Sequence, residues 1–192
     1  MLVFDGDTAK TVALYMGDMD QGQGGVNLTD HPRRLPGMAK VLKRLTLHNA
    51  KGQVISGIHQ DQDMFISIEY QRLDGILPSH VGFVLYSQEG IRVTGFNTAM
   101  EHCVTDSRIP RAGSVTFRIP GNSLNPGLFV VSPAISALPN NLLDKVEYAI
   151  SFEVQKSDIY GTGYILTSED GFFPLRCTMD ARSTEKDATI CD

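Results

Sequence analysis

Apolar and polar residues alternate along most of the chain from about residue 39 onward. Alternate positions of the segment 145–154 are apolar: Val146, Tyr148, Ile150, Phe152 and Val154. Segments 63–71 and 114–119 repeat this period of two. Because successive side chains of a strand point to opposite faces, the pattern predicts strands with one side toward a core and one toward solvent.

Turn-forming residues divide these segments into short pieces. Gly, Pro, Asn and Asp recur at intervals of about 8 to 15 residues, and helical periodicity is nearly absent between them. Without crossover helices, neighbouring strands pair most simply in antiparallel fashion. The expected fold is therefore all-β, an antiparallel β-sandwich or a barrel. The predicted strands are Lys40–Leu47, Asp63–Gln71, His80–Ser87, Ile91–Asn97, Ser114–Ile119, Gly127–Ser132, Lys145–Val154, Gly163–Thr167 and Phe172–Cys177.

The two ends of the chain differ in composition from this central part. Acidic residues followed by apolar ones predict a short N-terminal helix over residues 8–16. Gly and polar residues dominate the next stretch, so residues 17–38 are expected to form a flexible linker. The chain thus divides into the helix within residues 1–16, the linker, a β-domain over residues 39–178 and a polar tail over residues 179–192.

The charge balance argues against nucleic acid as a partner. Lys and Arg number 17 and Asp and Glu number 22, which gives a net charge of -5, and no basic run with interleaved aromatic residues occurs. No apolar run approaches the roughly 18 residues of a membrane span, and the N-terminus lacks the order of a signal peptide. Cys103, Cys177 and Cys191 are too widely spaced for a disulfide framework or a compact zinc site. We expect a soluble protein of a reducing cytoplasm.

The motifs of common enzymes are missing from the sequence. It contains no phosphate-binding loop, no Gly-x-Ser-x-Gly elbow, no His-Glu-x-x-His and no calcium loop. His102 and Cys103 would point to opposite faces of a strand, which argues against a metal site there. Asp61 and Asp63 leave a glycoside hydrolase open as an alternative, although two acids beside a strand start are more often turn residues. We predict no catalytic activity, no metal and no cofactor.

An ordered set of sequence blocks resembles a known family. The blocks are residues 63–70 (DMFISIEY), 80–86 (HVGFVLY), 89–98 (EGIRVTGFNT), 113–117, 124–129, 143–154 and 171–175. Together they resemble the C-terminal domain of Wzt-type ATPases from polysaccharide ABC exporters, over roughly residues 39–177. Residues 3–15 are similar to the last segment of such ATPases, so we interpret residues 1–16 as a remnant of a preceding ATPase domain.

The resemblance implies a jelly-roll or immunoglobulin-like β-sandwich that binds the exported O-antigen polysaccharide, often at a chemical cap on its non-reducing end. It also implies a homodimer, with exchange of the C-terminal strand between protomers as one form of it. The implied partners are the ATPase domain and the transmembrane subunit of the exporter. They place the domain in the cytoplasm, peripheral to the inner membrane.

The expected function is therefore a noncatalytic carbohydrate-binding module that gives the exporter its substrate specificity. A dimerisation module of the transporter ATPase, with no glycan ligand, is the alternative. The two hypotheses differ in what they require of exposed aromatic side chains, which would contact a sugar in the first and a second protomer in the second.

The segment around Gly90 offers a candidate sugar site. If Gly90 is the left-handed residue of a three-residue loop, Ser87 lies opposite Ile91 and the register of the hairpin follows. One face of the hairpin is then apolar and belongs to the core. The other face combines two aromatic rings, a guanidinium and a hydroxyl, from Tyr86, Arg92, Thr94 and Phe96.

Further candidates lie beyond this face. Asn97 and Thr98 follow Phe96 directly, with a strand-ending turn as the alternative role for both. His102 lies in the long connection to the next strand, and Arg118 lies on a separate polar stripe. Burial of Tyr86 and Phe96 under a loop or a partner subunit is the alternative to sugar binding.

Overall fold

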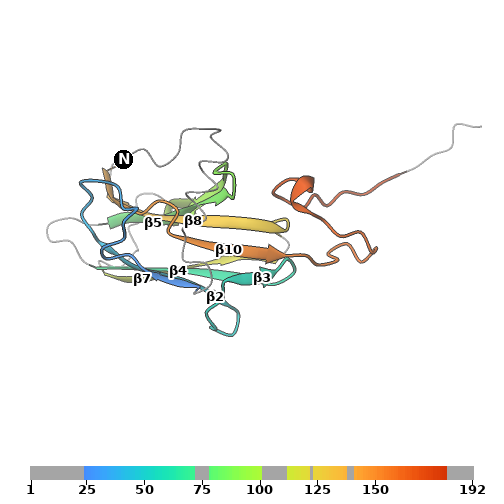
Figure 1. Ribbon diagram of the computed structural model, residues 1–192, viewed down its shortest axis with the longest axis horizontal. Helices are drawn as coiled ribbons and strands as arrows, with labels where there is room; N and C mark the ends of the chain where they lie inside the picture. Colours follow the sequence, from blue (N-terminus) through green and yellow to red (C-terminus); the bar gives the residue numbers. More distant parts are fainter. Residues whose placement is uncertain (1–23, 72–77, 101–111, 122, 138–140, 181–192) are drawn as a thin grey trace, which may run out of the picture.

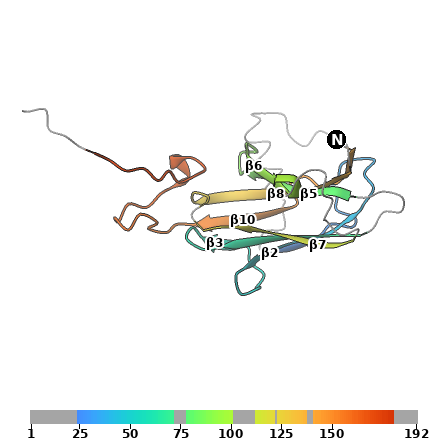
Figure 2. The same cartoon turned by 180° about the vertical axis from the view of Figure 1, so that it is seen from behind.

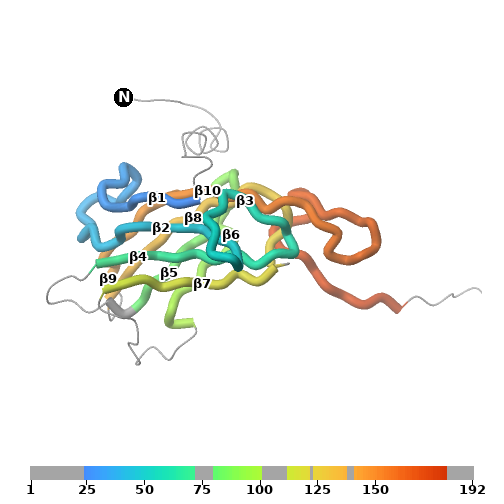
Figure 3. Tube along the Cα trace, turned by 90° about the horizontal axis from the view of Figure 1, so that it is seen from below, coloured from blue at the N-terminus to red at the C-terminus, as the bar shows by residue number. Residues whose placement is uncertain are grey.

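Two β-sheets packed face to face form the body of the protein (Figure 1). The computed structural model describes residues 24–71, 78–100, 112–121, 123–137 and 141–180. One sheet has four strands in the order β1 (Gly25–Asn27), β2 (Leu42–Asn49), β4 (Met64–Tyr70) and β7 (Gly113–Ile119), as Figure 3 shows. All its pairs are antiparallel.

The second sheet has six strands. Its main path runs β3 (Gly57–His59), β10 (Ile150–Gln155), β8 (Gly127–Ala137), β5 (Pro78–Ser87) and β6 (Arg92–Asn97), and β9 (Asn141–Lys145) pairs with the far end of β8. Only β3 and β10 pair in parallel among the described strands. Two short 3₁₀ helices, η1 (Thr98–Met100) and η2 (Ser168–Asp170), complete the described elements. The predicted all-β sandwich is confirmed.

The alternation seen in the sequence builds the core between the sheets. In β4, Met64, Ile66 and Ile68 point inward and are buried, while the residues between them are more exposed. Their counterparts on the six-stranded sheet include Val81 and Phe152, which are also buried. Burial of apolar surface on the two facing sheets therefore holds the sandwich together.

The predicted strand Lys145–Val154 is interrupted in the structure. Its two halves both pair with β8, but four residues, 146–149, lie opposite only two, 132 and 133. The amide of Val146 donates to the carbonyl of Pro133 at 3.2 Å, and that of Ala149 donates to Val131 at 2.8 Å. Tyr148 adopts a left-handed φ of 48° inside this bulge. The regular alternation ends there, so the predicted core orientation of Tyr148 is wrong.

The described part of the predicted linker packs on the sandwich. Strand β1 pairs with β2 in register, and Leu28, which follows it, is fully buried. The prediction of a flexible linker over residues 17–38 is therefore wrong for residues 24–38, because a short apolar segment there completes the sheet. The predicted helix over residues 8–16 lies outside the described residues.

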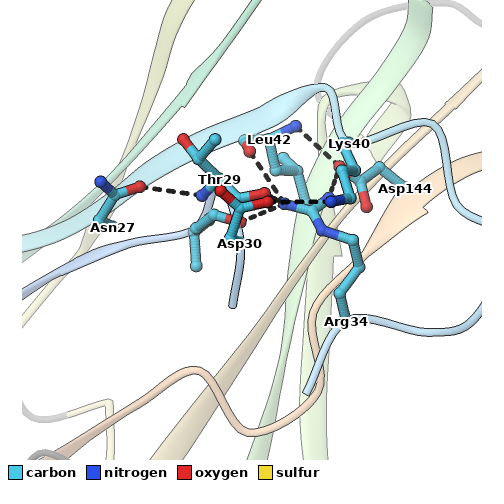
Figure 4. A network of polar contacts seen from close by, with 8 residues as sticks. Asn27, Thr29, Asp30, Arg34, Lys40, Leu42 and Asp144 are labelled. Atoms are coloured by element: carbon cyan, nitrogen blue, oxygen red, sulfur yellow. Dashed lines mark hydrogen bonds and ion pairs between the residues drawn. The ribbon is translucent and has the colours of Figure 1, made fainter. Parts of the chain in front are cut away.

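A buried ion pair fixes this N-terminal segment (Figure 4). The guanidinium of Arg34 binds the carboxylate of Asp144 on β9, and both side chains are almost completely buried. Arg34 also donates to the carbonyl oxygens of Leu28 and Leu42, and Asp144 accepts the Leu42 amide at 2.8 Å. The pair thus joins the N-terminal segment to both sheets.

The C-terminal segment projects from the sandwich. Residues 156–180, here called the arm, extend beyond the ends of β8 and β10 (Figures 1 and 2). Strands were predicted at Gly163–Thr167 and Phe172–Cys177, but neither segment forms a strand. Both predictions are wrong. In and before the first segment, the backbone amides of residues 161–163 and of Thr167 donate to aspartate side chains, not to a neighbouring strand. In the second segment, the Phe172 carbonyl accepts the amide of Asn125.

Side chains of the arm and the sandwich hold the arm in place. The carboxylate of Asp158 accepts the amides of Gly161 and Gly163, each at 2.8 Å. Asn125, which is buried in the sandwich, binds residues 170–172 of the arm. Its backbone amide donates to the Phe172 carbonyl at 2.9 Å, and its Nδ2 donates to the carbonyls of Asp170 and Gly171.

Within the described residues, no helix has the length and apolar character needed to cross a membrane.

Replacing Asp144 with Asn should lower the free energy of unfolding by about 3–5 kcal/mol, because the buried guanidinium of Arg34 would lose its counter-charge. Urea denaturation measures this change. The matched control is Asp30→Asn, which removes the acid of the exposed Lys40–Asp30 pair and should leave the free energy of unfolding nearly unchanged, because water screens that pair. Equal losses in the two variants would contradict the anchoring role of Arg34 and Asp144.

The arm should become less ordered in acid. The hydrogen bond from the Gly163 amide, supported by those from Thr162 and Gly161, holds the pKa of Asp158 below its ordinary value of 3.8. A lowered carboxyl pKa contributes order that is present above 3.8 and is lost as the pH falls through the folded-state pKa. Hydrogen exchange at Gly161 and Gly163 should therefore lose protection below that value. Asp158→Asn should remove the protection already at neutral pH, whereas Glu169→Gln on the same arm should retain it.

Candidate saccharide-binding face

The β5–β6 hairpin has the predicted loop but a different register along its strands. Gly90 has a left-handed φ of 77°, and the Ser87 amide donates to the Ile91 carbonyl at 2.9 Å. Tyr86 then lies opposite Arg92, but Leu85 lies opposite Thr94, so the register shifts by one residue at this point. A β-bulge in β6 causes the shift. Between these two pairs, β5 moves by one residue, whereas β6 moves by two, from Arg92 to Thr94.

This bulge splits the predicted polar face. Before it, Tyr86 and Arg92 share the outer face of the six-stranded sheet, and Asn97 lies on that face because it is opposite Gly82. After it, Thr94 and Phe96 lie opposite the core residues Leu85 and Phe83, on the face toward the other sheet. The prediction that Tyr86, Arg92, Thr94 and Phe96 form one face is therefore wrong.

The remaining sequence candidates have other places. Thr98 is buried, and its Oγ1 accepts the Val81 amide at 3.2 Å, so its role is structural. Asn97 accepts the Ala99 amide at 2.9 Å through Oδ1, which is the turn role weighed for it. Arg118 lies on the four-stranded sheet, in an ion pair with Asp63 at 2.6 Å. His102 lies outside the described residues.

A small groove is present on the outer face of the six-stranded sheet, where β5, β6 and β8 lie in one layer (Figure 2). Its volume is about 150 Å³. Its lining includes the small residues Gly82, Gly95 and Ala134, and its polar lining comes from His80, Arg92, Asn97 and Ser136. A methyl group on Gly82 would lie 2.4 Å from the Phe96 carbonyl oxygen and 2.5 Å from the Asn97 Cβ, so only glycine fits there.

Two tyrosine rings lie on the same face beside Arg92. Tyr86 and Tyr148 are half-buried, with ring centroids 5.0 Å apart and planes at 63°, an edge-to-face pair. The Tyr148 amide donates to Ser132 Oγ at 2.7 Å, and Arg33 Nη1 donates to the Tyr148 carbonyl at 3.0 Å. These bonds hold the strained backbone of Tyr148. Sequence reasoning missed Tyr148 because strict alternation assigned it to the core.

A second cavity lies between the sheets, at the edges formed by β6 and β7. This cleft has a volume of about 510 Å³ and a mostly apolar lining that includes Phe96, Phe117 and Phe173. Phe96 contacts Phe117 edge-to-face, with ring centroids 5.9 Å apart, and remains 39% exposed. Thr94 and Arg118 also line the cleft, so the structure brings three of the predicted residues together here.

The two carboxylates considered for glycoside hydrolysis are both bound by the protein. Asp63 accepts the Gly121 amide at 3.0 Å and Arg118 Nε at 2.7 Å, and Asp61 accepts the Ser157 hydroxyl at 3.1 Å. The Gly121 hydrogen bond, followed by the Arg118 bond, lowers the pKa of Asp63. A lowered pKa keeps Asp63 ionised near neutral pH, which is the opposite of what a general acid needs.

The chemistry of the outer face suits adhesion to a polyhydroxylated ligand. Tyrosine rings pack against the C–H faces of sugars, and guanidinium and amide groups bond hydroxyls or acidic groups. Among the described residues, no group of three or more His, Cys, Asp or Glu side chains is placed to hold a metal ion. The fold defines a β-sandwich domain, and its outer face presents these aromatic, guanidinium and amide groups.

Comparison with known proteins identifies its family. The family model of the Wzt C-terminal domain matches residues 39–166, and the chain belongs to this family. The crystal structure of the C-terminal domain of Wzt has the same fold: it is 18% identical, with 79% of this chain and 90% of that chain covered, at a TM-score of 0.56. No curated protein matches the chain. The family gives the chain a role in an O-antigen ABC transporter, alongside its ATPase and transmembrane parts.

Replacing Gly82 with Ala should force β5 and β6 apart at the groove and lower the free energy of unfolding by about 1–3 kcal/mol. The loss can be measured by urea denaturation. Gly25→Ala is the control, because an added methyl there would have no neighbour closer than 3.7 Å and should change the stability by less than about 0.5 kcal/mol. A Gly82→Ala variant as stable as Gly25→Ala would contradict the close strand approach.

Proposed function

We propose that this domain is a noncatalytic carbohydrate-binding module that recognises the polysaccharide exported by its ABC transporter. The observation that carries the proposal is the Tyr86–Tyr148 pair next to the groove lined by Arg92 and Asn97. Selection is by affinity: a finished chain held on this face is presented to the transporter. The transporter thereby acquires its substrate specificity from the domain.

The size of the groove favours recognition of a chain end. At about 150 Å³ it is smaller than the ~300–1,000 Å³ of sites that enclose whole small ligands, so it accepts one sugar unit or its substituent. The aromatic pair beside it supplies a surface for the adjoining sugar. We infer that the domain reads the capped non-reducing end of the polysaccharide, with the repeat contributing less.

The location of the domain follows from its role. We propose that it works in the cytoplasm, peripheral to the inner membrane, held there by the ATPase domain and the transmembrane subunit. Residues 1–16 resemble the end of such an ATPase domain, which supports a covalent tether to it. A tether raises the local concentration of bound polysaccharide at the transporter without any additional contact.

The arm supports a homodimer. Tyr164 is 60% exposed and Leu175 is 76% exposed on a segment that projects from its own sandwich. Such apolar side chains are typical of surfaces that a partner covers. We propose that the arm contacts a second protomer, with exchange of the C-terminal segment as one form of this contact. Two protomers also give two glycan sites, which strengthens binding by weak individual sites.

The exposed apolar residues of the arm also support a second candidate function, a dimerisation module with no glycan ligand. The two proposals assign different roles to exposed aromatic residues. The glycan-binding module needs Tyr86 and Tyr148 for ligand binding, whereas the dimerisation module needs only the arm.

The test is a titration of the full chain with lipid-free polysaccharide from its source strain, with the terminal cap present and removed. We expect binding of the capped form, and Tyr86→Ala should weaken it by about tenfold because it removes the aromatic contact to the sugar beside the groove. Tyr164→Ala is the control and should keep the glycan affinity. Calorimetry measures the affinity, and sedimentation measures the oligomeric state of each variant.

The outcomes separate the candidates. A Tyr86→Ala variant that keeps the dimer and loses glycan affinity supports the binding module. Equal binding of capped and uncapped chains would replace end recognition with recognition of the repeat. Absence of any glycan binding, together with loss of the dimer in Tyr164→Ala, would favour the dimerisation module.

A further inference from the structure

Arg92 is a charged side chain for which no partner is seen among the described residues. Within the described part of the chain, the structure shows no hydrogen bond or ion pair for Arg92 or for Arg176, which lies on the arm. The other described arginines are engaged. Arg34 binds Asp144, Arg118 binds Asp63, Arg33 binds the Tyr148 carbonyl and Arg44 binds the Thr46 hydroxyl.

The bulge places the Arg92 guanidinium at the groove. Arg92 lies opposite Tyr86 across the hairpin, and its Nη2 is close to the backbone of Gly95, 3.2 Å from where a Cβ on that residue would lie. A side chain at residue 95 would therefore compete for the space that the guanidinium occupies. The position of Arg92 over the groove is thus tied to the absence of a side chain on Gly95.

The rest of the described groove lining carries no acidic side chain. Its described lining includes His80, Asn97 and Ser136 as polar residues and contains neither Asp nor Glu. A guanidinium has five donors in a planar fork that matches two oxygens of one acidic group. A sugar hydroxyl would occupy a single donor, so a neutral sugar leaves most of the fork unused. An oxyanion pairs with it through charge-assisted bonds, which are the stronger kind.

We propose that the groove selects an anionic substituent, a carboxylate or a phosphate, on the sugar held beside the tyrosine pair. The inference rests on the proposed glycan-binding function and names the chemical class that the site takes. Arg92 is the residue that determines this specificity, and Asn97 borders the same space. The neighbouring rings of Tyr86 and Tyr148 then hold the uncharged part of the sugar.

Three methyl glucosides that differ only at C6 test the proposal with the full chain. They carry a hydroxymethyl group, a carboxylate or a phosphorylated hydroxymethyl group. Changes of the Gly82 and Gly95 amide resonances on titration measure the three affinities at one ionic strength. We expect at least one anionic glucoside to bind about tenfold more tightly than the neutral one, with the difference shrinking as salt is added. The carboxylate and phosphate arms show which anion is preferred.

Variants assign the preference to Arg92. Arg92→Gln should bring the affinities for the three glucosides to within about twofold of one another, and Arg92→Lys should retain part of the preference because it keeps the charge without the fork. Arg44→Gln, on the other sheet, is the control and should keep the full preference. Because residue 92 is exposed, these variants should fold like the original chain.

Equal binding of the three glucosides by the original chain would overturn the anionic specificity and leave the glycan-binding module standing. Binding of the source polysaccharide with no response to any of the three glucosides would also overturn it, since the groove would then not hold a single acidic sugar. Failure of the glycan-binding function itself has a different signature: neither the glucosides nor the polysaccharide would bind.

Discussion

The ion pair between Arg34 and Asp144 is the interaction on which the candidate face is built. It is buried where the N-terminal segment, β2 and β9 meet, so it joins the two sheets through a third piece of chain. Removing two charges from water is costly, and the additional hydrogen bonds to both groups offset part of that cost. Among the described residues, Arg34 Nε and Asp144 Oδ1 have no hydrogen-bond partner. The residue before Arg34 then contacts the bulge of residues 146–149. The backbone carbonyl of Arg33 accepts the Glu147 amide, and the guanidinium of Arg33 donates to the Tyr148 carbonyl. The buried pair therefore helps to fix the orientation of Tyr148, because it holds the segment that contacts the bulge.

Two β-bulges determine which residues share the outer face. Alternation in the sequence identified the central strands and the inward residues of β4 correctly, because burial on one face imposes the period of two. A bulge inserts residues without changing the composition of the segment. The local sequence therefore did not predict the register shift after Arg92 or the left-handed backbone of Tyr148. Sequence reasoning consequently grouped Thr94 and Phe96 with Tyr86, and assigned Tyr148 to the core. Only tertiary contacts, such as the Ser132 hydroxyl under Tyr148, fix these positions.

The two ends of the described chain departed from expectation for related reasons. Residues 24–38 have the composition of a linker, but Leu28 and Arg34 find partners far away in sequence. The arm has the apolar and aromatic residues of a strand, but Asp158 and Asp170 take up the amides that a strand would offer to a neighbour. Asn125, which the sequence marks only as part of a turn, donates to three carbonyl groups of the arm. In each case a single polar side chain outweighs the composition of the segment around it.

The bulge turns Tyr148 away from the interior, so the side chain at this position belongs to the outer face and not to the core. A substitution at this position changes what the sheet presents to a ligand without opening a cavity between the sheets, because neighbouring Val146 and Ile150 continue to fill that space. The bulge therefore provides a position on the outer face where the side chain can change while the core stays filled.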